Sequence, residues 1–135
     1  MPLPILLESF VVAEGSDETS GIREDPVAGI ERNDGLVVVS LAGELDLYNA
    51  NTVREALLEC CAESPERLIV DLSAVKFIDS TALGVLIEAR TRMANRKGFL
   101  LAAPGLETRR ALEISGLDRH FNVHESLDEA RTARL

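Results

Sequence analysis

Apolar residues form short continuous runs separated by longer stretches with helical spacing. The runs lie at residues 36–41 (LVVVSL), 67–72 (RLIVDL) and 99–103 (FLLAA). Such runs predict strands, and near-continuous ones are typical of parallel strands that are buried on both faces. The turn signal NDG at residues 33–35 precedes the first run, which predicts a β-hairpin at the start of the sheet.

Helical spacing fills the stretches between these runs. The first predicted helix spans residues 49–63, with Asn49 as its expected N-cap. Its apolar face comprises Ala50, Val53, Leu57 and Cys60. A second helix is predicted at residues 82–95, directly after the segment Asp79-Ser80-Thr81.

The last part of the chain predicts smaller elements. A helix is expected at residues 107–114, a short strand at 121–123, and a final helix after the capping box SLDE at 126–129. Strands separated by helices of this length pair in parallel through right-handed crossovers. The sequence therefore predicts one α/β domain, with a small mixed sheet that contains parallel strands and about four helices.

The first 26 residues differ from the rest. Residues 14–25 (EGSDETSGIRED) are rich in Gly, Ser and acidic side chains, which predicts a flexible linker. Residues 4–13 are partly apolar, but they lack the basic region of a signal peptide, and whether they add a strand or a helix is open. We predict an N-terminal extension at residues 1–26, flexible in part, and a globular domain at residues 27–135.

Charge excludes some partners. The chain has 135 residues, a formal net charge of −9 and only 4% aromatic residues. A phosphate backbone or an anionic membrane surface would repel such a chain, and few rings are available to stack bases. We expect no direct nucleic-acid contact and no membrane insertion. The acidity suits a basic protein partner, and it equally serves solubility.

Candidate catalytic and metal-binding groups are sparse. Cys60 and Cys61 are adjacent and have no metal-ligand spacing, which indicates buried thiols in a reducing compartment, the cytoplasm. His120 and His124 are four residues apart, but the residues between them are typical of a strand rather than a helix. There is no G-x-S-x-G motif. We expect no enzyme activity, no cofactor and no metal.

Three motifs resemble those of a known family. Residues 43–46 (GELD) and 71–85 (DLSAVKFIDSTALGV) are similar to the two signatures of STAS domains, and residues 114–117 (ISGL) followed by Phe121 are similar to the family's C-terminal pattern. The resemblance is to anti-sigma factor antagonists and covers residues from about 27 to the C-terminus. Ala82 stands where the family usually has Gly, beside the expected phosphorylation site, where its methyl group can change which partner docks.

The resemblance implies a partner switch. The unphosphorylated domain would bind an anti-sigma factor that is also a serine kinase, and so free the sigma factor. Phosphorylation of Ser80 by that kinase would end binding, and a phosphoserine phosphatase would reset the switch. Partner contacts would come from Glu44, Asp46, Asp79, Ser80 and Thr81, with Thr81 a lesser phosphoacceptor. The chain would act as a monomer or a weak dimer.

Plainer explanations stay open at this point. Ser80 suits the N-cap of a helix, and Asp79 competes for that position. Asp46 suits a turn. The alternative function is a STAS scaffold without a switch, as a subunit of a stress-signalling, transporter or lipid-trafficking complex, because one fold hosts several tasks.

Overall fold

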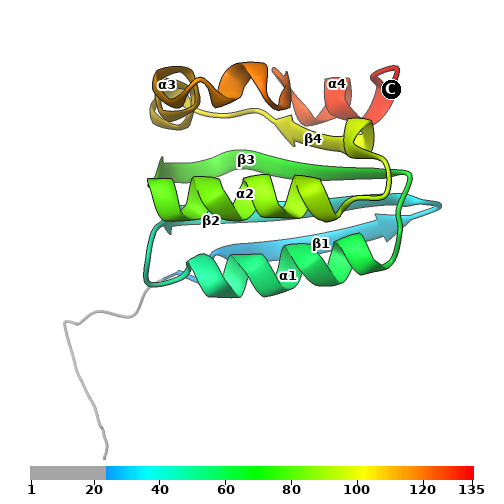
Figure 1. The fold of residues 1–135 in the computed structure, drawn as a ribbon, viewed down its shortest axis with the longest axis horizontal. Helices are drawn as coiled ribbons and strands as arrows, with labels where there is room; N and C mark the ends of the chain where they lie inside the picture. Colours follow the sequence, from blue (N-terminus) through cyan, green and yellow to red (C-terminus); the bar gives the residue numbers. More distant parts are fainter. Residues whose placement is uncertain (1–23) are drawn as a thin grey trace, which may run out of the picture.

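Five strands form one sheet whose order, β1-β2-β3-β4-β5, follows the chain. The computed structural model describes residues 24–135, and helices alternate with most of the strands (Figure 1). In chain order the elements are β1 (Val27–Asn33), β2 (Leu36–Leu45), α1 (Ala50–Ala62), β3 (Arg67–Ile78), α2 (Ser80–Arg92), the 3-10 turn η1 (Arg96–Gly98), β4 (Phe99–Ala102), α3 (Leu106–Ser115), the 3-10 turn η2 (Leu117–Arg119), β5 (Asn122–His124) and α4 (Leu127–Thr132).

The pairing confirms the predicted mixed α/β sheet. β1 and β2 are antiparallel, and every later neighbouring pair is parallel. The hairpin turns at Asp34 and Gly35, whose φ angles are 49° and 84°. Two positive φ angles in a two-residue turn match the twist of the flanking strands, which is why the NDG signal predicted the hairpin correctly.

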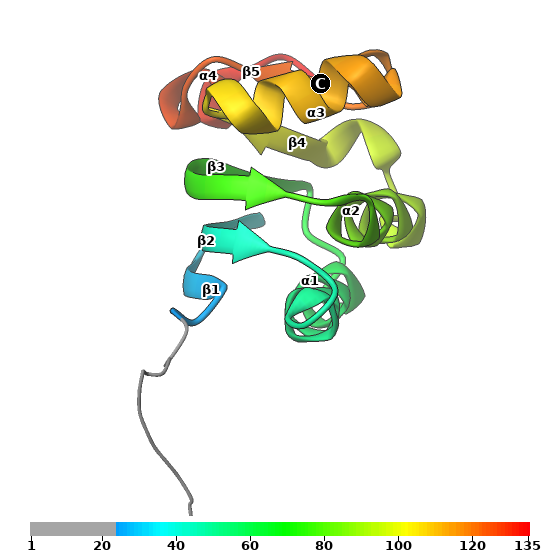
Figure 2. The ribbon, with the colours of Figure 1, turned by 90° about the vertical axis from the view of Figure 1, so that its left-hand side faces the viewer.

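The helices cover both faces of the sheet. α1 and α2 lie side by side on one face (Figure 2), where the main core packs. The buried residues of α1 are Ala50, Val53, Leu57, Cys60 and Cys61, which confirms its predicted apolar face. On the other face, Ala130 of α4 packs with buried residues of β2, β3 and β4, namely Val38, Ile69, Leu100 and Ala102. Among residues 24–135, no helix has the length and apolarity needed to cross a bilayer.

Several element ends differ from the predictions. β2 continues through the GELD segment to Leu45, with a register shift after Gly43, whose φ is +78°. Gly43 therefore lies within an irregular stretch of the strand, which extends beyond the predicted run at residues 36–41. α2 begins at Ser80 and ends at Arg92, because Met93 turns to an extended conformation with its side chain buried. The predicted helix at residues 82–95 was thus displaced at both ends.

Arginine side chains connect distant segments at the edge of the sheet where β2, β3 and β4 begin. Arg67 at the start of β3 donates to the carbonyl oxygens of Ala130 and Ala133, at 2.5 and 2.7 Å, and so holds the end of α4. Arg32 donates to both carboxylate oxygens of Glu63 at the end of α1, and this pairing lowers the pKa of Glu63. These contacts join segments far apart in the sequence.

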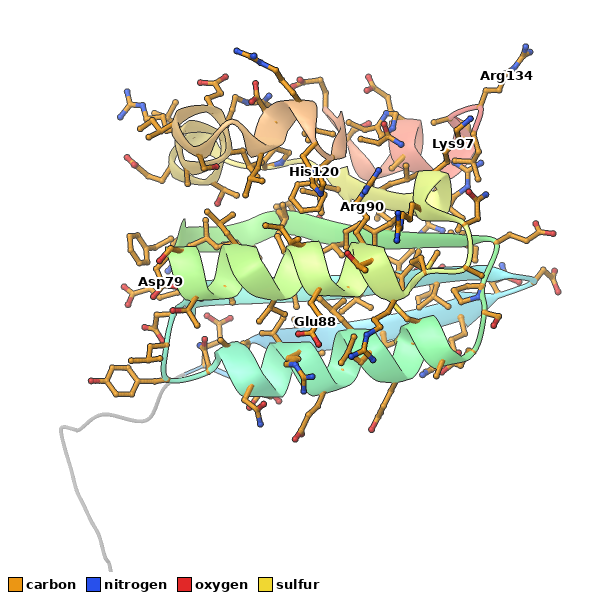
Figure 3. All side chains as sticks on the ribbon, viewed as in Figure 1. Asp79, Glu88, Arg90, Lys97, His120 and Arg134 are labelled. Carbon is orange, nitrogen blue, oxygen red and sulfur yellow. The ribbon has the colours of Figure 1, made fainter. Side chains whose placement is uncertain are left out.

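The two helices of the main face are also joined by an ion pair. Arg54 of α1 donates from two nitrogens to the carboxylate of Glu88 at 2.8 Å, which lowers the pKa of Glu88. Figure 3 labels Glu88 between α1 and α2. The thiols of Cys60 and Cys61 on α1 are buried, and burial raises the pKa of Cys61 to about 11. Cys60 and Cys61 therefore stay protonated and unreactive at neutral pH.

Most of the predicted extension at residues 1–26 lies outside the described residues. Its division from the domain at residues 27–135 stays a prediction.

Candidate functional site

β2, β3 and β4 are parallel, so their C-terminal ends meet at one edge of the sheet, opposite the edge that Arg67 closes. Asp79 lies at this edge, at the start of α2 (Figure 3). One of its carboxylate oxygens accepts from the amide of Ala82 at 3.0 Å, and the other accepts from the amide of Leu47 at 3.2 Å. Its own amide donates to the carbonyl of Leu45. Asp79 therefore caps α2 and ties the loop after β2 to it.

The loop after β2 has a hydrogen-bond network of its own. Asp46 accepts from the amide of Tyr48 at 3.0 Å through its side chain. Asn49 accepts from the amide of Asp46 through Oδ1, and donates to the carbonyl of Glu44 through Nδ2 at 2.8 Å. Asn49 takes the predicted N-cap position of α1, but its side chain makes no capping hydrogen bond. The side chain of Asn49 instead holds the loop after β2, because Asn side chains readily hydrogen-bond to nearby backbone groups in a turn.

Ser80 is the first residue of α2, and both Ser80 and Thr81 are exposed. Asp79 takes the N-cap position, which decides between the two candidates for that role. Within residues 24–135, no hydrogen bond to the Ser80 hydroxyl is present. The hydroxyl group is thus presented at the edge of the sheet without a part in holding the helix.

Ala82 and Gly84 lie on different sides of α2 near its start: one faces the core and the other faces outward. Ala82 is 2% exposed and belongs to the main core, so its methyl group does not face a partner. A direct contact of this methyl group with a partner is therefore not supported, and any indirect effect of Ala82 on docking stays a prediction. Gly84 is exposed, one helical turn after Ser80, and a Cβ added there would meet nothing within 4 Å.

Four large apolar side chains are exposed along the same edge. They follow or end three adjacent strands, and their exposed fractions are 68% for Leu47, 86% for Tyr48, 49% for Phe77 and 63% for Leu106. We call these four residues the apolar rim. The sequence analysis missed them, although the pair Leu47-Tyr48 in a turn was a usable signal. Exposed apolar groups that gather at one place mark interaction sites.

Charged groups border the apolar rim. Glu44 is exposed and pairs in register with Phe77, and it lines an open hollow together with Glu24, Gly43 and Lys76. The five predicted contact residues, Glu44, Asp46, Asp79, Ser80 and Thr81, therefore all lie at this edge. Within the described part of the chain, no three His, Cys, Asp or Glu side chains are grouped to hold a metal ion.

Comparison with known proteins identifies the family of this chain. The model of the STAS domain matches residues 28–130. The chain belongs to the STAS-domain family. It is 36% identical over 100 residues to the anti-sigma-F factor antagonist RsfB of Mycobacterium tuberculosis, covering 74% of this chain and 82% of that protein. It is 34% identical to the anti-sigma-B factor antagonist of Bacillus subtilis, covering 65% and 81% of the two chains.

Solved structures agree with this assignment. The crystal structure of an anti-sigma factor antagonist from Mycobacterium paratuberculosis superimposes with a TM-score of 0.73 at 38% identity, covering 77% of this chain and 89% of that one. The chain is thus a member of the anti-sigma factor antagonist family, as the motifs suggested. Both STAS signatures lie at the edge described above: GELD ends β2, and the second signature runs from β3 into α2.

Proposed function

We propose that this STAS domain is a phosphorylation-dependent antagonist of an anti-sigma factor. In its unphosphorylated form it binds an anti-sigma factor with serine-kinase activity and so releases a sigma factor. Phosphorylation of Ser80 by that kinase ends binding, and a phosphoserine phosphatase restores it. The protein acts in the cytoplasm as a binding protein rather than an enzyme, as a monomer or a weak dimer.

The main support for this proposal is that Asp79 caps α2, whereas the side chain of Ser80 does not. Asp79 accepts the capping hydrogen bond from Ala82, while the exposed Ser80 hydroxyl is not used by the fold. A kinase therefore reaches the hydroxyl without unwinding α2, and the modified domain keeps its cap.

The phosphate would change the surface and not the fold. A phosphoserine adds about −1.5 to −2 charges at neutral pH. At the first turn of a helix it meets unpaired amide groups and the positive end of the helix dipole, which stabilise it locally. It would also stand beside the carboxylate of Asp79, so this edge becomes more negative. A partner that packs against the edge loses affinity through repulsion and desolvation.

The chemistry of the edge fits a protein partner. The apolar rim supplies area to bury, and Tyr48 in particular is the kind of residue that contributes strongly to interfaces. The acidic groups around it, Glu44, Asp46 and Asp79, suit a partner with basic side chains. Glu44 and Asp46 take part in other interactions within the chain, so their role in binding would be shared with the loop's own structure.

Phosphate mapping tests this proposal. Trypsin releases residues 77–90 (FIDSTALGVLIEAR), whose hydroxyl groups are those of Ser80 and Thr81 alone. We would isolate the chain from its native host in growth and under stress, fragment this peptide and locate any phosphate. Phosphate on Ser80 whose occupancy changes with condition supports the switch.

The opposite result would be equally informative. If neither residue carries phosphate in any condition, the switch is wrong and the scaffold without a switch is favoured. Phosphate on Thr81 alone would move the switch by one residue and contradict the role of Ser80.

A further inference from the structure

The described part of the chain begins at the same edge as the candidate site. β1 runs antiparallel to β2, so its first residue, Val27, pairs near the C-terminal end of β2 with Leu41. The carbonyl of Pro26 accepts from Ala42, and a side-chain oxygen of Glu24 lies 3.1 Å from the position of a Cβ on Gly43. Residues 1–23 therefore join the domain next to the apolar rim.

The sequence of those residues has two parts with different chemistry. Residues 14–23 are rich in Gly, Ser and acidic side chains. Residues 3–13 (LPILLESFVVA) carry a single ionisable side chain, Glu8. Their large apolar residues are Leu3, Ile5, Leu6, Leu7, Phe10, Val11 and Val12. An apolar segment of this kind gains free energy when it covers exposed apolar area.

We propose that residues 3–13 dock on the apolar rim of the same molecule and compete there with the protein partner. This regulatory contact rests on the proposed function, because it acts on the surface that would bind the anti-sigma factor. Binding of the anti-sigma factor would then be reduced in two ways: by phosphate on Ser80, and by the N-terminal segment of the same chain when Ser80 is unmodified.

The connecting residues are long enough for this contact. A chain rich in Gly and Ser spans on average about 5–6 Å multiplied by the square root of its length, which gives roughly 15–20 Å for residues 14–23. Fully extended, it reaches about 35 Å. A domain of this size has a radius of gyration of about 13 Å, so every residue of the apolar rim is within reach.

Charge favours this segment over a second copy of the domain. Glu24 and Glu44 line one hollow with Lys76, Asp46 and Asp79 hold the neighbouring loop, and Glu107 pairs with Arg110 next to Leu106, so acidic groups outnumber basic ones. Two such edges facing one another would repel. Residues 3–13 add almost no charge to the edge, whereas the acidic stretch that follows them is unsuited to lie on it. The low-charge segment is therefore better suited to this surface than a second copy of the domain.

The chain provides its own reporter for a test. Tyr48 is the single tyrosine and there is no tryptophan, so intrinsic fluorescence reports on the apolar rim alone. Acrylamide, a neutral quencher, would be titrated into the unmodified full-length chain and into the double variant L6D/F10D. We expect quenching of Tyr48 to be about threefold weaker in the wild type, because tethering gives the segment a millimolar effective concentration.

A control separates docking from added charge. The variant S16D/T19D adds the same charge within the linker and should quench like the wild type. The variant L6S/F10S removes apolar area without charge and should quench like L6D/F10D. Equal quenching in the wild type and both apolar-segment variants would overturn the proposal. Protection that disappears on dilution would also overturn it, since the segment would then come from a second copy.

Competition is measured separately with the anti-sigma factor. L6D/F10D should bind it about threefold more tightly than the wild type, because the apparent affinity of the wild type is lowered by the same uncovered fraction of molecules that limits quenching. If Tyr48 is released in this variant while its affinity is unchanged, the competition is wrong. The quenching experiment needs no partner and no phosphate, so a failure of the Ser80 switch leaves its result unaffected.

Discussion

The two edges of the sheet are built in opposite ways. At the edge where β2, β3 and β4 begin, Arg67 and Arg32 use their guanidinium groups to join segments that are distant in the sequence. At the edge where these strands end, Asp79 and Asn49 hydrogen-bond to backbone groups at the end of β2 and in the loop after it, and large apolar side chains are exposed. One edge closes the fold, and the other is held rigid while its surface stays available.

This difference shows where a small domain accommodates a binding surface. Exposed apolar side chains cost free energy, and they are kept where the backbone beneath them is fixed. The loop that carries Leu47 and Tyr48 is tied at both ends by side-chain hydrogen bonds, so a partner would meet a surface that is already ordered. An ordered surface loses less entropy on binding. Substitutions at the two edges should therefore separate binding from stability.

The largest effect on binding is expected at Ser80. The substitution Ser80→Glu places a negative charge at the first position of α2, and affinity for the anti-sigma factor should fall by about 100-fold or more. Titration calorimetry would measure the loss, and the melting temperature should stay within about 3 °C of the wild type. Thr91→Glu makes the same change at an exposed position near the end of α2 and should leave affinity unaltered. Equal affinity for wild type and Ser80→Glu would refute the charge mechanism.

The opposite edge should show the reverse pattern. Arg67→Met keeps much of the side-chain length but removes the donors to Ala130 and Ala133, leaving two carbonyl groups without their partner. We expect unfolding free energy to fall by roughly 2–3 kcal/mol in urea denaturation, with affinity unchanged. Arg96→Met, at an exposed position on the same edge, removes an equal charge and should have little effect. If the Arg67→Met variant is fully folded and still loses affinity for the anti-sigma factor, stability and binding are not divided between the two edges.

Asp79 should contribute both to stability and to binding, since it caps α2 and also holds the loop that carries Leu47 and Tyr48. Asp79→Ala should cost about 1–2 kcal/mol and also weaken binding, because two hydrogen bonds are lost. Asp79→Ser has one side-chain oxygen, so it should restore the cap but not the bond to Leu47. Stability would then recover while affinity would not.

A cap at the other edge provides the control for Asp79. Asn95 accepts from the amide of Lys97 at 3.1 Å, and Asn95→Ala should lower the melting temperature without touching affinity. If Asp79→Ser binds as tightly as the wild type, the bond to Leu47 is not needed for recognition.

The sequence predicted the strands and the core more successfully than it predicted the site's details. Runs such as residues 67–72 are unambiguous because both faces of a central parallel strand are buried. Asn49 takes its predicted N-cap position, but the sequence did not show that its side chain bonds to Asp46 and Glu44, because a side chain that suits a helix cap also suits a turn. The apolar rim was missed because exposure depends on which strands end side by side, which periodicity along the chain does not contain.

The smallest predicted effect concerns Gly84, where local preference and function conflict. Gly is a poor residue for the interior of an exposed helix, and the space around Gly84 would admit a methyl group. Gly84→Ala should therefore raise the unfolding free energy by about 0.5–1 kcal/mol. Because Gly84 shares a face of α2 with Ser80, the same methyl group should project into the partner and reduce affinity, by roughly tenfold if the contact is closely packed.

Thr91→Ala separates these two effects of the added methyl group. It improves helix preference on the same helix, at an exposed position away from the apolar rim, and should stabilise slightly at constant affinity. A Gly84→Ala variant that is more stable and binds normally would show that the face of α2 bearing Ser80 lies outside the interface. The partner would then be limited to the loop residues of the apolar rim, and the phosphate on Ser80 would have to act from beside the interface rather than within it.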